Sequence, residues 1–185
     1  MGVQAHPVGG GALPVISDSY RRLNAIAHRD PAYGTAARAH APLVQAVIDQ
    51  CGATSLLDYG AGKQVLRDLV TVDEYRAYDP AIPEIADAPD PADVVYCGDV
   101  MEHVEPEHTN AVLADVVRLA RTAAVFVIST KPASRLLDDG STAHRNVQPR
   151  IYWYRRLKGL GRLTRLPADE RGNVIAVVRP RTADD

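Results

Sequence analysis

The chain has 185 residues, a formal net charge of −2 and 46% hydrophobic residues, which predicts one domain with a buried core. Its two cysteines exclude a disulfide framework, no apolar run is long enough to cross a membrane, and the N-terminus lacks the pattern of a secretory signal. We therefore expect a cytoplasmic protein with a flexible lead-in at residues 1–16 and a single domain at residues 17–185.

Helices and strands are predicted to alternate along the chain. Helical spacing of apolar residues predicts helices at 18–28, 36–50, 63–70, 105–122 and 148–160. Short apolar runs predict strands at 54–60, 74–80, 92–98 and 123–130, followed by an antiparallel pair at 160–166 and 173–180. This order is typical of an α/β fold with a mostly parallel sheet of about six strands and helices on both faces.

Three polar segments each follow a predicted strand. They read DYGAGK, YDP and CGDVMEH. Because the carboxyl ends of parallel strands meet at one edge of a sheet, we expect these segments to converge on one crevice. Gly60 and Gly62 allow a sharp turn and a close approach to a ligand, although a dinucleotide-binding loop would need a further glycine where Val65 stands. Asp79 ends the second strand, where an acid accepts hydrogen bonds from ribose hydroxyls.

In order and spacing, LLDYGAGK, YDP and DVVYCGDVMEHVEP resemble the class I S-adenosylmethionine-dependent methyltransferases over residues 30–155. The resemblance implies a Rossmann-like fold with S-adenosyl-L-methionine as cofactor. It also implies that the glycine-rich turn holds the methionine part of the cofactor and that the acid after the second strand binds the ribose. The expected cofactor-binding residues are Tyr33, Asp58, Gly60, Ala61, Gly62, Asp79, Pro80, Cys97, Gly98 and Asp99.

Two features depart from the pattern of that family. Gln64 replaces the third glycine of the loop, so its side chain must point away from the cofactor or touch it. Only residues 81–91 separate the second strand from the third, so the edge strand that normally follows the second strand is expected to be missing. This loss removes the acid that usually contacts the adenine amino group, and Pro80, Ile82 or Ile85 is expected to cover the adenine instead.

The segment DVMEH places Asp99, Glu102 and His103 at positions i, i+3 and i+4, which would share one face if a helix began there. Many family members carry a similar segment that only caps and packs. The small-RNA 3′-terminal ribose 2′-O-methyltransferases instead bind a divalent metal through a carboxylate, a Glu-His pair and a downstream histidine. By that resemblance Asp99, Glu102, His103 and His144 would hold Mn²⁺ or Mg²⁺, with Mn²⁺ suiting two imidazoles better.

His144 follows the fourth strand and has three interpretations: a general base for an O–H or N–H acceptor, a metal ligand, or a bystander. With His103 and Glu102 it makes up the expected catalytic set. We expect a monomer or homodimer that methylates an oxygen or nitrogen atom of a small-molecule or nucleotide-like substrate. Methylation of an RNA 3′ end is the alternative reaction, and a cofactor-binding module that acts through partners is the alternative without catalysis.

Positive charge is concentrated in the C-terminal third of the chain. Residues 131–185 carry a balance of +6, whereas residues 1–130 carry −8. Such a face either meets an acidic substrate such as a nucleotide or RNA, or is simply solvated. The arginines at 145, 150, 155 and 156 would suit a phosphate, and the aromatic run 152–154 is expected to pack the last helix on the sheet.

Overall fold

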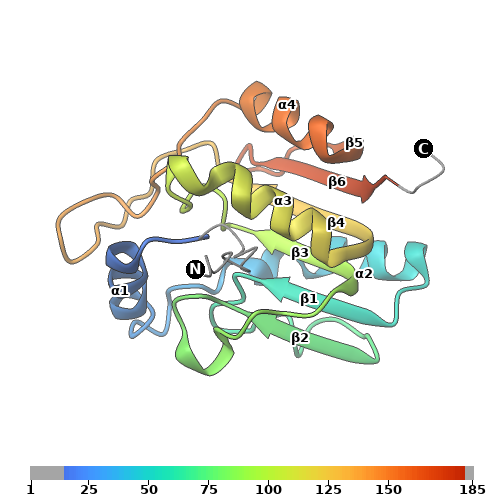
Figure 1. Ribbon diagram of the computed structural model, residues 1–185, viewed down its shortest axis with the longest axis horizontal. Coiled ribbons are helices and arrows are strands. Elements are labelled where there is room, and N and C mark those ends of the chain that lie inside the picture. The colour runs from blue at the N-terminus through green and yellow to red at the C-terminus, as the bar shows by residue number, and fades with distance from the viewer. Residues whose placement is uncertain (1–14, 182–185) are drawn as a thin grey trace, which may run out of the picture.

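The computed structural model describes residues 15–181, so all but the last two residues of the expected lead-in lie outside it (Figure 1). One sheet of six strands has the order β2-β1-β3-β4-β6-β5. The strands are β1 (Ser55–Tyr59), β2 (Glu74–Tyr78), β3 (Ala92–Gly98), β4 (Ala120–Ile128), β5 (Gly161–Leu166) and β6 (Val174–Pro180). The helices are α1 (Asp18–Ala27), α2 (Ala41–Cys51), α3 (Thr109–Leu119) and α4 (Arg150–Leu160), with short 3-10 helices η1 (Ala36–His40), η2 (Pro83–Ile85) and η3 (Pro106–His108).

The predicted α/β fold with a mostly parallel sheet is confirmed. Strands β1 to β4 are parallel, and β6 is antiparallel to both β4 and β5. Strand β2 forms one edge of the sheet, as expected for a sheet that lacks the strand after it. The chain leaves β1 for β2 and returns to β3 on the other side of β1, so a ligand crevice is expected outside the carboxyl ends of β1 and β3.

Helices cover both faces of the sheet. Helices α3 and α4 pack on one face, and α2 packs on the other (Figure 1). Trp153 and Tyr154 of α4 are buried in the core on the α3 side, which confirms the packing expected for the aromatic run. No helix within residues 15–181 combines the length and the apolar character needed to cross a lipid bilayer.

The predicted helix at 63–70 is wrong, because the structure forms a series of turns there. Gly62 and Gln64 both have left-handed backbones, with φ of 50° and 53°, and a left-handed residue cannot continue a right-handed helix. The Lys63 side chain donates a hydrogen bond to the carbonyl oxygen of His28, which ties the turn to the end of α1. Leu66 is fully buried and anchors the segment to the core.

The predicted helix at 105–122 begins and ends differently in the structure. It starts with the 3-10 turn at Pro106, becomes α-helical at Thr109 and ends at Leu119. Strand β4 follows at once from Ala120, three residues before its predicted start. The backbone of Ala120 is extended and its amide donates to Val117, so helix and strand meet without a connecting loop.

Gly98 permits a buried hydrogen bond behind the end of β3. The Tyr96 ring lies over Gly98, and its hydroxyl is 2.7 Å from Nδ1 of His40, where either group can donate, depending on the imidazole tautomer. A Cβ atom at position 98 would clash with the Tyr96 phenol.

We predict that Gly98→Ala destabilises the fold, because the phenol must move away from His40 or the strand must shift. Overpacking of this kind costs about 1–3 kcal/mol, to be measured as the free energy of unfolding in urea. Gly159→Ala is the control, since nothing lies within 4 Å of its added methyl group and α4 should tolerate it. Equal stability of the two variants would contradict this role of Gly98.

Candidate active site

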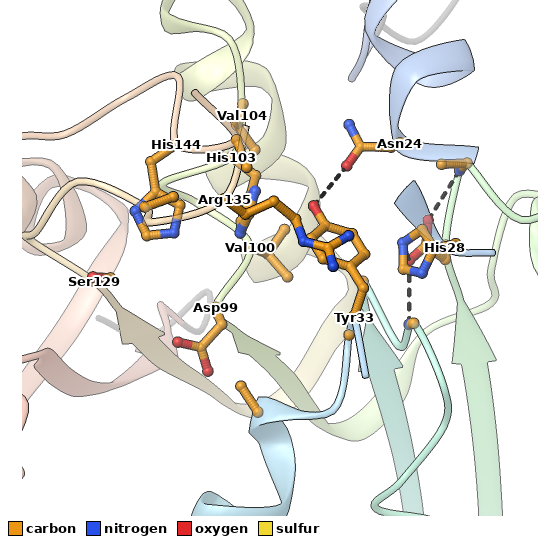
Figure 2. Close-up of a pocket in the computed structure, with 18 of the residues that line it drawn as sticks. Asn24, His28, Tyr33, Asp99, Val100, His103, Val104, Ser129, Arg135 and His144 are labelled. Carbon is orange, nitrogen blue, oxygen red and sulfur yellow. Dashed lines mark hydrogen bonds and ion pairs between the residues drawn. The ribbon is translucent and has the colours of Figure 1, made fainter. Parts of the chain in front are cut away.

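A cavity of about 680 Å³ lies at the carboxyl ends of the parallel strands, between α1 and the loops that follow β1, β2, β3 and β4 (Figure 2). The expected site residues that line it are Tyr33, Gly60, Gly62, Asp79, Pro80, Asp99, His103 and His144. The expected residues outside the lining are Asp58, Ala61, Cys97, Gly98 and Glu102. The structure therefore gathers residues from five separate parts of the chain around one space.

Asp58 points away from this cavity because side chains alternate along a strand. Its neighbours Leu57 and Tyr59 lie in the core on the α3 side, so Asp58 faces the α2 side. There its carboxylate accepts a hydrogen bond of 2.7 Å from the Tyr75 hydroxyl, and burial raises its pKa to about 7. Direct contact of Asp58 with a cofactor stays a prediction. The position of Asp58 outside the cavity lining does not support it.

The glycine-rich turn is held by hydrogen bonds from its own backbone. The N–H groups of Gly60 and Ala61 donate to the Tyr78 carbonyl oxygen at 2.7 and 3.0 Å. Gly60 has φ of 78°, and a Cβ atom there would clash with Val100. The glycine is therefore required by both its backbone angle and the close approach of the loop after β3.

Asp79 is buried and already has partners on both carboxylate oxygens. Its Oδ1 accepts from the Ala81 N–H at 2.9 Å, and its Oδ2 accepts from the Gly62 N–H at 3.2 Å. Nε2 of His28 lies 3.7 Å from the same Oδ2. Burial lowers the pKa of His28, and the charge of Asp79 opposes that effect. A ribose would share this carboxylate with the turn and displace or contact His28.

Helix α1 covers the cavity and is fastened at both ends. Ser17 caps its N-terminus and donates a hydrogen bond of 2.7 Å to Glu105, and the Tyr20 hydroxyl donates one of 2.9 Å to the Ala143 carbonyl oxygen. At the other end, the Lys63 side chain reaches the His28 carbonyl oxygen. These contacts hold α1 against the loops after β3 and β4.

Tyr33 spans the middle of the cavity. Its hydroxyl donates to Asn24 of α1 at 3.1 Å, and its ring packs edge-on against His28 at 4.9 Å (Figure 2). The Arg135 guanidinium lies 5.0 Å from the ring centre on one side, and the His103 ring lies 6.2 Å away. Tyr33 thus connects the Asp79 end of the cavity to the histidine end.

Asp99 has φ of 53°, so no helix begins at DVMEH, and residues 101–103 form turns instead. The expected shared helix face is therefore wrong. The carboxylate of Asp99 lies 3.6 Å from Nδ1 of His40 and points away from His103 and His144 (Figure 2). Burial raises the pKa of Asp99, and His40 opposes the shift.

Glu102, His103 and His144 lie together, with one ligand atom from each within 4.8 Å of the others. Glu102 is fully buried, and its Oε1 accepts from the Ser129 N–H at 3.1 Å. Burial, with repulsion from Asp99, raises the pKa of Glu102 to about 8. Burial also lowers the pKa of His103 to about 3, with a smaller contribution from His144.

The orientation of His144 leaves one ring nitrogen available. Its Nδ1 is 2.6 Å from the Lys131 carbonyl oxygen, which can only accept, so Nδ1 carries the hydrogen. In the neutral imidazole Nε2 is then an acceptor, either for a proton or for a metal. The His103 ring packs edge-on against His144 at 4.7 Å and restricts its rotation.

This group fits a divalent transition metal, but without Asp99. Within residues 15–181, Oε2 of Glu102 and Nδ1 of His103 are buried and have no hydrogen-bond partner. A carboxylate and two imidazoles are suitable ligands for Mn²⁺ or a similar ion. Three of the four expected ligands therefore come together, and the fourth lies beside His40.

Sequence reasoning missed His28, His40 and Arg135, which all lie at or behind the cavity wall. His28 and Arg135 lie in segments without a recognisable sequence motif. Only the fold places His28 next to Asp79 and Arg135 next to Tyr33. His40 precedes Pro42 at the start of α2, and this position gave no sign of its contact with Tyr96.

The sequence matches no protein-family model and no curated protein. One similar solved structure is the mitomycin 7-O-methyltransferase MmcR, with a TM-score of 0.60 and 15% sequence identity; the match covers 86% of this chain and 60% of that one. Another is DhpI in complex with SAH, with a TM-score of 0.55 and 20% identity; the match covers 88% of this chain and 94% of that one. A third is the 1,6-didemethyltoxoflavin N1-methyltransferase of Burkholderia thailandensis with bound 1,6-didemethyltoxoflavin and S-adenosylhomocysteine. Its TM-score is 0.55 and its sequence identity 15%, and the match covers 96% of this chain and 99% of that one. The chain thus spans less than two thirds of MmcR but nearly all of the other two. The sheet, the glycine-rich turn and this likeness together establish that the chain has the Rossmann-like fold of class I S-adenosylmethionine-dependent methyltransferases.

Proposed function

We propose that the chain transfers a methyl group from S-adenosylmethionine to an oxygen or nitrogen atom of a small-molecule acceptor. The observation that carries this proposal is the single cavity that joins Asp79 and the glycine-rich turn to His103 and His144. One end offers a carboxylate and backbone groups for a nucleoside, and the other offers a base. The similar structures include a mitomycin 7-O-methyltransferase and a 1,6-didemethyltoxoflavin N1-methyltransferase, which supports a small acceptor.

The cofactor end fits S-adenosylmethionine in its residue types. Asp79 would accept hydrogen bonds from the ribose hydroxyls, and Pro80 with Ala81 would lie against the adenine side. Asp99 lines the cavity, and its Oδ2 accepts no hydrogen bond within residues 15–181, although it lies 3.6 Å from Nδ1 of His40; such a carboxylate suits the positive amino group of the methionine part. When bound, S-adenosylmethionine supplies an electrophilic methyl group.

His144 is proposed as the base that takes the proton of the acceptor. The Lys131 carbonyl holds its Nδ1–H, so Nε2 is available to the cavity. The position of the His144 ring is fixed by its packing against His103 and by the Lys131 carbonyl in the loop after β4. Most of the rate increase would come from aligning the acceptor with the methyl group, with the base contributing a smaller factor.

A divalent metal at Glu102, His103 and His144 is proposed as an alternative way to activate the acceptor. A metal there would lower the pKa of a bound hydroxyl and relieve the unfavourable burial of the Glu102 charge. The position of Asp99 beside His40 gives no support to the four-ligand arrangement that motivated RNA 3′-end methylation. We therefore do not extend the proposal to RNA.

We predict that Asp79→Asn weakens the binding of S-adenosylhomocysteine by about tenfold or more, because the charged acceptor for the ribose hydroxyls is lost. Isothermal titration calorimetry measures the affinity, and thermal unfolding checks that the variant is folded. Asp87→Asn is the control, since Asp87 is exposed in the same connection and does not line the cavity. Unchanged affinity in Asp79→Asn would argue against a cofactor site here.

We predict that His144→Ala lowers kcat by roughly 10²- to 10⁴-fold with an acceptor that the wild type methylates, because the proton has no base. Release of S-adenosylhomocysteine across a panel of small hydroxylated and amine acceptors would identify such a compound and give the rate. The affinity for S-adenosylhomocysteine should stay the same in the variant, and the exposed neighbour variant Thr142→Ala should keep full activity. A fully active His144→Ala would rule out the base.

We predict that Mn²⁺ binds the protein saturated with S-adenosylhomocysteine and that His144→Ala abolishes this binding, because only two ligands remain. Calorimetric titration of Mn²⁺ measures both. Asp99→Asn should bind Mn²⁺ as the wild type does, since its carboxylate lies beside His40. No binding to the wild type would reject the metal and leave the proton acceptor as the role of His144.

A further inference from the structure

Helix α4 and strand β5 carry charge of one sign only. Residues 147–166 hold six Lys or Arg and no Asp or Glu, which leaves −8 on the rest of a chain whose net charge is −2. The six are Arg150, Arg155, Arg156, Lys158, Arg162 and Arg165. Strand β5 is the sheet edge opposite β2, and α4 lies next to β6 (Figure 1). The basic residues thus collect at one end of the sheet, which we call the α4–β5 surface.

These six charges are not neutralised within residues 15–181. None of them forms an ion pair with an acidic side chain there. The arginines that do form such pairs are Arg76, Arg118, Arg121, Arg135 and Arg145. Other arginines, such as Arg22 and Arg38, also form no ion pair in the described part of the chain, so the α4–β5 surface is distinguished by having six such cations and no acid in one short segment.

One of the six basic residues faces a further arginine across two strands. Arg162 of β5 lies directly opposite Arg179 of β6 in the antiparallel register. Like charges in that position destabilise a sheet. The pair faces the α2 side of the sheet, because Leu163 and Val178 at the next positions pack on the α3 side, so it adds positive charge at this edge but not on the outer face of α4.

Aromatic rings hold several of these arginines in fixed positions. The Arg156 guanidinium lies 3.8 Å from the centre of the Tyr152 ring, and that of Arg165 lies 4.5 Å from the Tyr154 ring. Stacking leaves the N–H edges of the exposed Arg165 guanidinium free to bind a carboxylate with two hydrogen bonds, whereas Nε of Arg156 is buried. Less side-chain entropy is then lost when an acidic group binds.

The outer face of α4 combines charge with an exposed apolar residue. Ile151, Arg155 and Lys158 are spaced i, i+4 and i+7, and all three are exposed, Ile151 to 51%. Apolar contact flanked by cations suits a protein segment better than a phosphodiester strand. The opposite sheet edge would also repel a long nucleic acid, because residues 68–93 hold eight acids and one arginine.

We propose that the α4–β5 surface binds an acidic protein partner, whose carboxylates meet the arginines and whose apolar side chain packs on Ile151. The chain runs from His144 to the start of α4 in six residues, so a bound partner lies close to the loop that carries His144. The proposal does not depend on the proposed methyl transfer, because it rests on a different surface.

The test uses the full chain and two fluorescent peptides of equal charge, one of Glu and Gly and one of Glu and Leu, with a uridylate 20-mer as competitor. Fluorescence anisotropy gives the affinities at low salt. Arg155→Glu/Lys158→Glu should weaken both peptides by about tenfold or more. Arg22→Glu/Arg38→Glu changes the net charge equally at exposed sites on α1 and η1 and should bind as the wild type does.

Two further variants separate the contributions. Ile151→Ser should weaken the Glu-Leu peptide and leave the Glu-Gly peptide unchanged. Arg162→Glu should raise the melting temperature, since it relieves the pair with Arg179, and should change peptide binding far less than Arg155→Glu/Lys158→Glu, because Arg162 faces the α2 side of the sheet. Equal losses in the two double variants would overturn the proposal, because net charge alone would explain binding. Tighter binding of the uridylate, lost in Arg155→Glu/Lys158→Glu, would also overturn it in favour of a nucleic acid.

Discussion

The hydrogen bonds that join the turn after β1 to the end of β2 are the constraint on which the site depends. One carbonyl oxygen, that of Tyr78, accepts two N–H groups of the turn, and the next residue, Asp79, accepts a third from Gly62. These bonds fix the distance between the glycine-rich turn and the acid without any ligand. The loop after β3 then packs on Gly60 through Val100, so the three strand ends share one cavity wall.

The two ends of the cavity differ in how their polar groups are satisfied. At the first end, Asp79 is fully hydrogen-bonded and His28 stands next to it, so a ribose must compete for the carboxylate. At the second end, buried atoms of Glu102 and His103 have no partner among residues 15–181. Unsatisfied buried groups are unfavourable in the free protein, and a bound acceptor, proton or metal would satisfy them. Under the proposed function, the first end would bind the cofactor ribose and the second would activate the acceptor.

The charge distribution follows the order of the strands. The sheet begins at an acidic edge at β2 and ends at the basic α4–β5 surface, while the cavity lies between them. Opposite charges at the two edges discourage edge-to-edge pairing of like edges between copies. The same separation leaves the basic edge free for another molecule without disturbing the cofactor end.

The sequence by itself determined the sheet, its missing edge strand and the gathering of the glycine-rich turn, Asp79 and His103 at one edge, because strand periodicity and the rule of strand ends are local or topological. It did not determine the turns at 63–70, where Gln64 has a left-handed backbone and the Lys63 side chain contacts the end of α1. Only the tertiary structure turned Asp58 toward Tyr75 and Asp99 toward His40, and only it placed His28 against Asp79. The orientations of these side chains depend on which face of a strand is buried and on which distant helix packs there. A short sequence motif contains neither kind of information.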